Sequence, residues 1–129
     1  MRIDNLQYAS WSEKIFRQMR EGGVDAVHVT IACHENFRET VLNIEKWNRY
    51  FEQFPELIMQ AFETKDIATA KATGRTAIIF GAQNPSPIEG DIGLVAALHQ
   101  LGLRFMQLSY NNQSLLATGC YEAEDRWHE

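Results

Sequence analysis

The chain has 129 residues, of which 45% are hydrophobic, so it is long enough to bury one modest core and has the composition of neither a disordered nor a membrane-spanning protein. Its formal net charge of -5, with only 12 scattered Lys and Arg, excludes the basic stripe that a nucleic-acid partner needs. Cys33 and Cys120 lie far apart and the first residues lack a secretory signal, so we expect a cytoplasmic protein with free thiols.

The first predicted elements are a strand, a helix and a second strand. Residues 3–8 form a short strand, and Ser10 with Glu13 has the spacing of a capping box that starts a helix ending near Glu21. Residues 24–32 are rich in Val, Ile and Thr, which is typical of a strand buried on both faces. His28 lies within this strand, and we expect it to pack in the core rather than to bind a ligand.

A long amphipathic helix follows. Asn36 and Glu39 predict its capped start, apolar residues recur at intervals of three and four, and Pro55 ends it. We expect its aromatic face to bury against a sheet. Residues 57–62 fit either a short strand or a helical turn, and residues 64–72 predict a short helix.

The remaining elements form a strand, crossover helix, strand unit in residues 77–110. Glu89 and Asp91 lie at the start of its helix. Acidic residues stabilise helix starts, so their position is explained without a pair of catalytic carboxylates. The expected inner face of that helix consists of Leu94, Val95, Leu98 and Leu101. The second strand is expected at residues 105–108, and the polar residues that follow the two strands are Gln83, Asn84, Tyr110 and Asn111. Parallel strands present their carboxyl ends at one rim, where α/β sheets and barrels build their sites.

These elements predict an α/β fold with about four parallel strands and crossover helices, which fits either a small open sheet or the first half of a (β/α)8 TIM-type barrel. No covering helix follows the last strand, so we expect residues 1–129 to be a single partial domain, the amino-terminal half of a barrel. Exposed strand edges in such a half would favour a homo-oligomer. The acidic end, residues 122–129, is expected to be solvated.

Two segments carry a resemblance to a known family. Gly81 to Asn84, followed at a fixed spacing by Leu-Gly-Leu-Arg-Phe and Leu-Ser-Tyr in residues 101–110, resembles the renal (membrane) dipeptidase family. That family has Gly-x-Glu-Gly and then Leu-x-x-Leu-Gly-x-Arg-Tyr-x-x-Leu-Thr-His at these places. Residues 3–8 stand where the family has Asp-Gly-His-x-Asp. The similarity covers most of this chain and the first part of a family barrel.

The resemblance implies an amidohydrolase-like barrel whose two zinc ions activate a water molecule for attack on a dipeptide amide. Where the family has its first His-x-Asp metal pair, this sequence has Leu6 and Tyr8, and Gln83 replaces the bridging glutamate. Tyr110 replaces a substrate-contacting histidine. Leucine cannot coordinate and glutamine is a neutral donor, so we expect no metal in this chain; the remaining family ligands would lie beyond Glu129.

The first hypothesis is therefore a fragment of a dipeptidase-family hydrolase that is inactive by itself. In the complete barrel, the residues expected to position a small peptide or amide substrate are Gln83, Asn84, Tyr110 and Asn111. The second hypothesis is a non-catalytic α/β module that binds a small polar ligand at this rim or associates with another copy through its strand edges. The sequence leaves open whether the chain is itself an enzyme.

Overall fold

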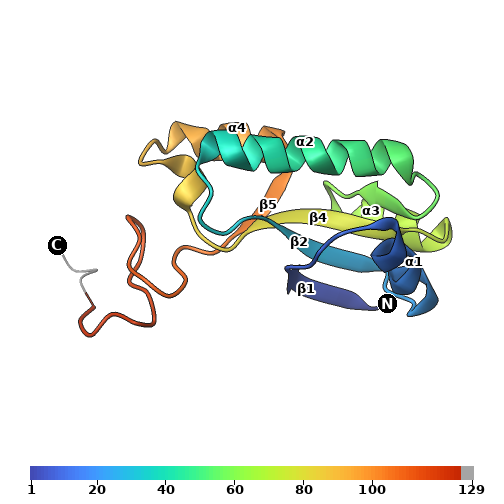
Figure 1. The fold of residues 1–129 in the computed structure, drawn as a ribbon, viewed down its shortest axis with the longest axis horizontal. Coiled ribbons are helices and arrows are strands. Elements are labelled where there is room, and N and C mark those ends of the chain that lie inside the picture. The colour runs from blue at the N-terminus through green and yellow to red at the C-terminus, as the bar shows by residue number, and fades with distance from the viewer. Residues whose placement is uncertain (126–129) are drawn as a thin grey trace.

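The computed structural model describes residues 1–125, in which parallel strands alternate with helices (Figure 1). The elements in chain order are β1 (Ile3–Gln7), α1 (Glu13–Glu21), β2 (Ala26–Ala32), α2 (Phe37–Gln53), β3 (Ile58–Gln60), α3 (Thr64–Ala72), β4 (Thr76–Ala82), the 3-10 turn η1 (Ser86–Ile88), α4 (Gly93–Gln100) and β5 (Leu103–Met106). Across residues 1–125, none of the helices is long and apolar enough to cross a bilayer. The predicted acidic end reaches into residues 126–129, which lie outside the described residues.

The sheet is parallel throughout and is organised around β4. The strand order is β1-β2-β4-β3, with β5 also pairing with β4. β2 runs along one edge of β4, while β3 pairs with residues 76–78 and β5 with residues 80–82 of the opposite edge. One edge of β4 thus pairs first with β3 and then with β5. The parallel strands and crossover helices confirm the predicted α/β class.

The strands differ from their sequence-based bounds by at most two residues: β1 ends one residue earlier and β2 begins two residues later than predicted. The segment 57–62, which fitted either a strand or a turn, forms the short strand β3. The last strand was predicted two residues too late, because it begins at Leu103 directly after Gly102. Gly102 has φ +111, a conformation that suits glycine, so the chain passes from α4 into β5 through the two-residue turn of Leu101 and Gly102.

Of the two capping boxes that the sequence predicts, the one at α2 forms and the one at α1 does not. At α2, the Asn36 side chain accepts a hydrogen bond from the Glu39 amide, and the Glu39 side chain accepts one from the Asn36 amide. This reciprocal capping box confirms the prediction. At α1 the predicted box of Ser10 and Glu13 is absent: the helix begins after Ser12, whose side chain makes no capping hydrogen bond.

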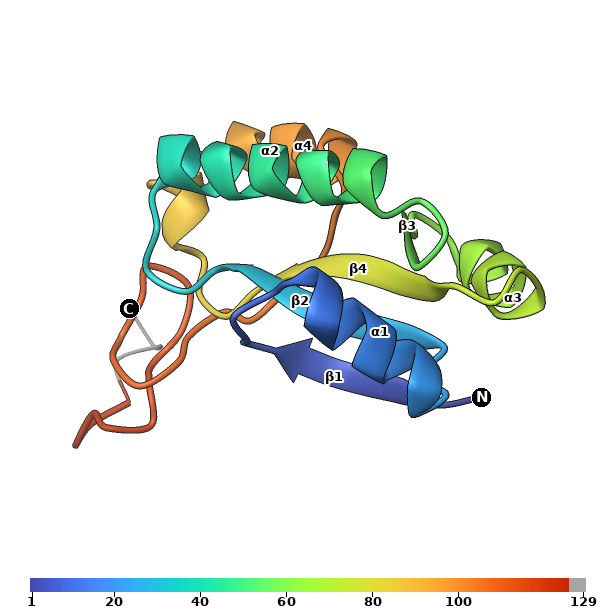
Figure 2. The ribbon, with the colours of Figure 1, turned by 45° about the vertical axis from the view of Figure 1, so that its right-hand side comes forward.

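The main core lies between one face of the sheet and helices α1, α2 and α4 (Figure 2). Phe16 of α1, Trp47 of α2 and Leu98 of α4 are all almost completely buried there. They pack with alternate residues of β2 and β4, including Val29 and Phe80. The aromatic face of α2 is therefore core, as predicted, with Trp47 5.9 Å from Phe16 and 6.2 Å from Phe80 between ring centroids.

The predicted inner face of α4 is partly wrong. Leu98 is buried and Leu94 packs against the core, but Val95 and Leu101 are 38% and 39% exposed. α4 has only eight residues, so a single narrow stripe faces the sheet and the residues beside it point to solvent.

The opposite face of the sheet, which we call the inner face, is only partly covered. It carries a smaller cluster in which Ala70 of α3 packs with Ala77 and Ile79 of β4. Ile3 of β1 and Phe105 of β5 are 55% and 52% exposed. Phe105 lies on this face because its ring is 4.2 Å from that of His28 between centroids. Beyond the part that α3 covers, the inner face therefore presents apolar side chains that no other described residues cover.

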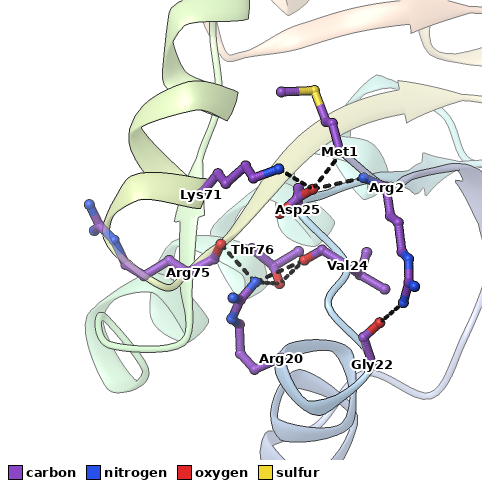
Figure 3. Close-up of polar contacts among 9 residues, drawn as sticks. All are labelled: Met1, Arg2, Arg20, Gly22, Val24, Asp25, Lys71, Arg75 and Thr76. Atoms are coloured by element: carbon purple, nitrogen blue, oxygen red, sulfur yellow. Dashed lines mark hydrogen bonds and ion pairs between the residues drawn. The ribbon is translucent and has the colours of Figure 1, made fainter.

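The amino ends of the strands are tied together by Asp25, at the start of β2 (Figure 3). Its Oδ2 accepts a hydrogen bond from the Arg2 amide at 2.7 Å and lies 3.8 Å from the terminal ammonium of Met1 and 3.7 Å from Lys71 Nζ of α3. Nearby, Arg20 donates to the carbonyl oxygens of Val24 and Arg75. These contacts fix the end of the sheet that lies opposite the predicted site rim.

Candidate functional site

The site rim is built where β2, β4 and β5 end. β2 is followed by Cys33, β4 by Gln83 and Asn84, and β5 by the segment that holds Tyr110 and Asn111. The Gln83 amide donates to the carbonyl of Ala32, so the backbone pairing of β2 and β4 continues to the first rim residue. The parallel sheet therefore delivers polar side chains from separate parts of the sequence to one end, as the strand pattern predicts.

Both the nitrogen and the oxygen of the Gln83 carboxamide form hydrogen bonds. Its Nε2 donates to Thr30 Oγ1 at 3.0 Å, and its Oε1 accepts from Cys33 Sγ at 3.7 Å. Burial raises the pKa of the Cys33 thiol, and the nearby Glu35 carboxylate raises it further, so the thiol keeps the proton that it donates. Gln83 is thus fixed against β2 in one orientation.

Glu35 organises the start of the loop after β2. Its Oε2 accepts hydrogen bonds from the amides of Cys33, at 2.6 Å, and His34, at 2.9 Å. Burial alone would raise the pKa of this carboxyl group, but the backbone amide hydrogen bonds outweigh it and leave the pKa below its ordinary value. Glu35 therefore stays ionised while it shapes the rim, and its hydrogen bonds account for it without a metal.

Asn84 and Asn111 come together at a cavity of about 470 Å³, which we call the loop pocket. The loop pocket is lined by His34, Asn84, Pro85, Ser86, Ile88, Glu89, Gly90 and residues 111–116. Asn84 Nδ2 donates to the carbonyl of Cys33 at 2.6 Å, and Asn111 Oδ1 accepts from Cys120 Sγ at 3.7 Å. The volume lies within the range of small-molecule sites.

The other two predicted site residues lie outside the lining of the loop pocket. Gln83 faces Thr30 and Cys33 instead, and Tyr110 is 41% exposed. The carbonyl oxygen of Tyr110 accepts a hydrogen bond from the Cys120 amide, which folds the segment after β5 back on itself. The structure thus brings two of the four residues to one cavity and leaves the other two beside it.

Sequence reasoning missed Glu89 and Ser86 as residues of this cavity. Asp91 lies at the start of α4 as expected, and its Oδ1 accepts from the Gly93 amide at 2.9 Å, but the N-cap residue is Ile92 and the helix has no side-chain cap. Glu89 lines the loop pocket, and its Oε2 accepts from the Phe37 amide at the start of α2, at 3.1 Å. The one signal was the Pro-Ser-Pro-Ile sequence, which forms the 3-10 turn η1 at the edge of the pocket.

His28 lies on the inner face below the rim and is 5% exposed, as expected of a core residue. Its Nδ1 lies 2.8 Å from Asn5 Oδ1, an acceptor, so Nδ1 carries the proton and Nε2 has the lone pair. Nε2 is buried without a hydrogen-bond partner among the described residues. Burial lowers the pKa of this imidazole, so the neutral ring is the favoured form.

The zinc pair that the family resemblance implies does not fit the residues present. Leu6 has no donor atom, and Tyr8 is 74% exposed. Both ends of the Gln83 carboxamide are occupied by Thr30 and Cys33. Within residues 1–125, no group of three or more His, Cys, Asp or Glu side chains is placed to hold a metal ion. This part of the chain offers amides, hydroxyls and a few acids at its rim, which suit binding and orienting a polar molecule.

Comparisons with known proteins agree with this architecture. The model of a family described as membrane dipeptidase, peptidase family M19, matches residues 4–129. An amidohydrolase from Pseudomonas aeruginosa superposes with a TM-score of 0.92 at 38% sequence identity, over 98% of this chain and 38% of the amidohydrolase. The probable dipeptidase PvdM of the same organism superposes with a TM-score of 0.67 at 15% identity, over 79% of this chain and 30% of PvdM, and shows the fold alone.

The length of the match defines which part of the fold is present. This chain spans less than two fifths of either of these two structures. Its parallel strands and crossover helices correspond to the first half of a TIM barrel, so the predicted half-barrel is confirmed.

Proposed function

Because the chain belongs to the membrane dipeptidase family, peptidase family M19, we propose that it forms the amino-terminal half of a hydrolase barrel that cleaves dipeptides or other small amides. The observation that carries this proposal is the family match over residues 4–129 together with a polar pocket at the carboxyl ends of the strands. Sites of barrel enzymes lie at that end of the strands.

The substrate-positioning residues of this proposal are Gln83, Asn84, Tyr110 and Asn111. Asn84 and Asn111 support it because both line the loop pocket. Gln83 supports it because its fixed carboxamide shapes the rim between β2 and β4. Amide groups both donate and accept hydrogen bonds, so they can hold a peptide bond without altering its charge.

Amide hydrolysis needs an activated water molecule as well as groups that position the substrate. Zinc would provide that water in the family, yet Leu6, Tyr8 and Gln83 do not form its ligands. We therefore propose that the 129-residue chain binds small peptides and does not hydrolyse them.

A peptide titration tests this proposal. The amide signals of the chain are recorded by NMR while alanyl-alanine is added, and hydrolysis is followed in the same samples with and without zinc. We expect shifts confined to the rim, with those of Asn84 and Asn111 among the largest, and no cleavage above the rate of a sample without protein. Peptide binding without rim shifts would refute the site, and cleavage abolished by a chelator would refute the inactivity of the chain.

A second candidate function is self-association as a non-catalytic module. Ile3 and Phe105 favour it, because they expose apolar surface on the inner face beside strand edges. A sizing column run on the same samples separates the two candidates: a concentration-dependent dimer that ignores peptide supports this second function, and a monomer that binds peptide supports the first.

The remaining partner and location assignments are proposals of the same kind. Cys33 and Cys120 are both free, which supports a reducing cytoplasm. The net charge of -5 supports a small-molecule ligand over nucleic acid. We propose no membrane partner for this part of the protein.

A further inference from the structure

The loop pocket has a negatively charged lining. Glu89 is the one carboxylate among its lining residues, and none of them is Lys or Arg. His34 is the one imidazole there, and its side chain is exposed. At neutral pH the lining therefore attracts a cation and offers no fixed positive charge to a carboxylate.

Glu89 is held in place on the pocket wall. One of its carboxylate oxygens, Oε2, accepts from the Phe37 amide, which leaves Oε1 able to accept from another donor. The backbone at Glu89 has φ +49, a left-handed conformation that residues with a Cβ seldom adopt. Gly90 follows with φ +81. Glu89 is the C-cap of η1, and its hydrogen bond to Phe37, 52 positions away in the sequence, fixes this side chain relative to α2.

Two further groups on the same wall lack a donor. Ser86 Oγ is buried and has no hydrogen-bond partner among the described residues. Asn84 uses its Nδ2 on the Cys33 carbonyl, so its Oδ1 is left as an acceptor. The pocket thus combines one negative charge with oxygen acceptors from three neighbouring parts of one loop.

We infer that the loop pocket binds a primary ammonium group, with Glu89 as its charge partner and Asn84 Oδ1 and Ser86 Oγ as further acceptors. An ammonium group carries three N–H donors and no acceptor, which matches this set. Ile88 and Leu116 form apolar wall beside it and suit a small aliphatic side chain. The inference rests on the proposed function, in which the ammonium group is the amino end of the peptide.

The test compares two probes that differ only at this group. Alanyl-alanine amide has an ammonium and no carboxylate, and its N-acetyl derivative has neither. Binding to the 129-residue chain is measured by calorimetry at pH 7. We expect the acetylated probe to bind at least about ten-fold more weakly, which corresponds to about 1.4 kcal/mol. Raising the pH to about 9.5 deprotonates the free amine and should weaken the first probe alone.

Variants assign the effect to the pocket. Glu89→Gln keeps the acceptor for the Phe37 amide and removes the charge, so we expect an about ten-fold loss for the ammonium probe and none for the acetylated one. Glu52→Gln, at an exposed position of α2, is the matched control and should bind as the wild type does. Ser86→Ala provides a second variant with an expected smaller loss, and circular dichroism verifies folding of each.

The outcomes separate this inference from the function on which it rests. Equal binding of both probes, or an unchanged affinity in Glu89→Gln, would overturn the ammonium site while leaving peptide binding at the rim intact. If neither probe binds, the proposed function and the ammonium site fall together. Selective binding of the amine that Glu89→Gln removes establishes the site.

Discussion

Gly81 shows how a single missing Cβ shapes the inner face. A Cβ built on this residue would lie 1.7 Å from His28 Nε2, far closer than atoms can approach. The imidazole therefore occupies the space that a side chain on β4 would fill, and it contacts Asn5 of β1 and Phe105 of β5. This glycine is required by the packing of its neighbour, because its own φ is not in the left-handed region.

We predict that Gly81→Ala lowers the free energy of unfolding by about 1 to 3 kcal/mol, the usual cost of overpacking a filled core. Urea denaturation measures the change. Gly93→Ala is the control: its Cβ would meet only the end of the exposed Asp91 side chain, at 3.1 Å, and we expect a much smaller loss. Combining Gly81→Ala with His28→Ala should cost less than the sum of the single changes, and strict additivity would contradict the packing explanation.

At the scale of single elements, α2 connects the core to the site rim. Its aromatic face packs on the sheet, and its first turn donates the Phe37 amide to Glu89 of the loop pocket. The capping box of Asn36 and Glu39 satisfies other amides of the same turn. The start of this helix therefore has two independent sets of acceptors, one local and one from the loop after β4.

We predict that Asn36→Ala destabilises the fold by about 1 kcal/mol through loss of the cap at α2. Asn48→Ala, an exposed position inside the same helix, is the matched control and should be neutral or slightly stabilising. Both are compared by urea denaturation. A loss in the Asn48 variant as large as that in the Asn36 variant would show that the cap is not the cause.

The same elements show what sequence reasoning can and cannot reach. The bounds of α2 and α3 were predictable because Asn36, Pro55 and the 64–72 pattern are local signals. β3 was ambiguous because three residues carry no readable period. Local sequence patterns do not encode contacts between distant segments. Such contacts decide the exposure of Val95 and Leu101 and the hydrogen bond from the Phe37 amide to Glu89.

At the scale of the whole molecule, the two ends of the sheet have different tasks. The carboxyl end carries the loop pocket, whereas the amino end is bound together by Asp25, which contacts the first residues of the chain and Lys71 of α3. In barrel folds the amino-terminal end of the strands serves stability. Asp25 thus joins three segments that are separated in the sequence, at the end farthest from the proposed site.

The pKa of Asp25 is lowered, chiefly by the hydrogen bond from the Arg2 amide and further by Lys71 and the terminal ammonium, while partial burial opposes them. Its ionised form therefore stabilises the fold above the ordinary value of 3.8, and this contribution is lost as the pH falls through the lowered pKa. We predict that Asp25→Asn lowers the Tm at pH 7 and that the difference from wild type shrinks below pH of about 4.

Glu21→Gln removes the same charge from an exposed position near the end of α1 and serves as the control for Asp25→Asn in thermal melts. It should leave the Tm at pH 7 nearly unchanged, as is usual for surface substitutions. Equal melting curves for wild type and Asp25→Asn at pH 7 would mean that the contacts at the amino end do not stabilise the fold.

The shared edge of β4 has a geometric consequence for closure of the sheet. On one edge of β4, β3 pairs with residues 76–78, so β5 pairs only from Phe80 onward. On the other edge, β2 already pairs from Ala77. A sheet bends into a closed cylinder only when successive strands are displaced along their neighbours, and the short strand imposes such a displacement at this position. Deleting β3 should therefore alter the tilt of any strand that pairs beyond β5, although none of its residues lines the loop pocket.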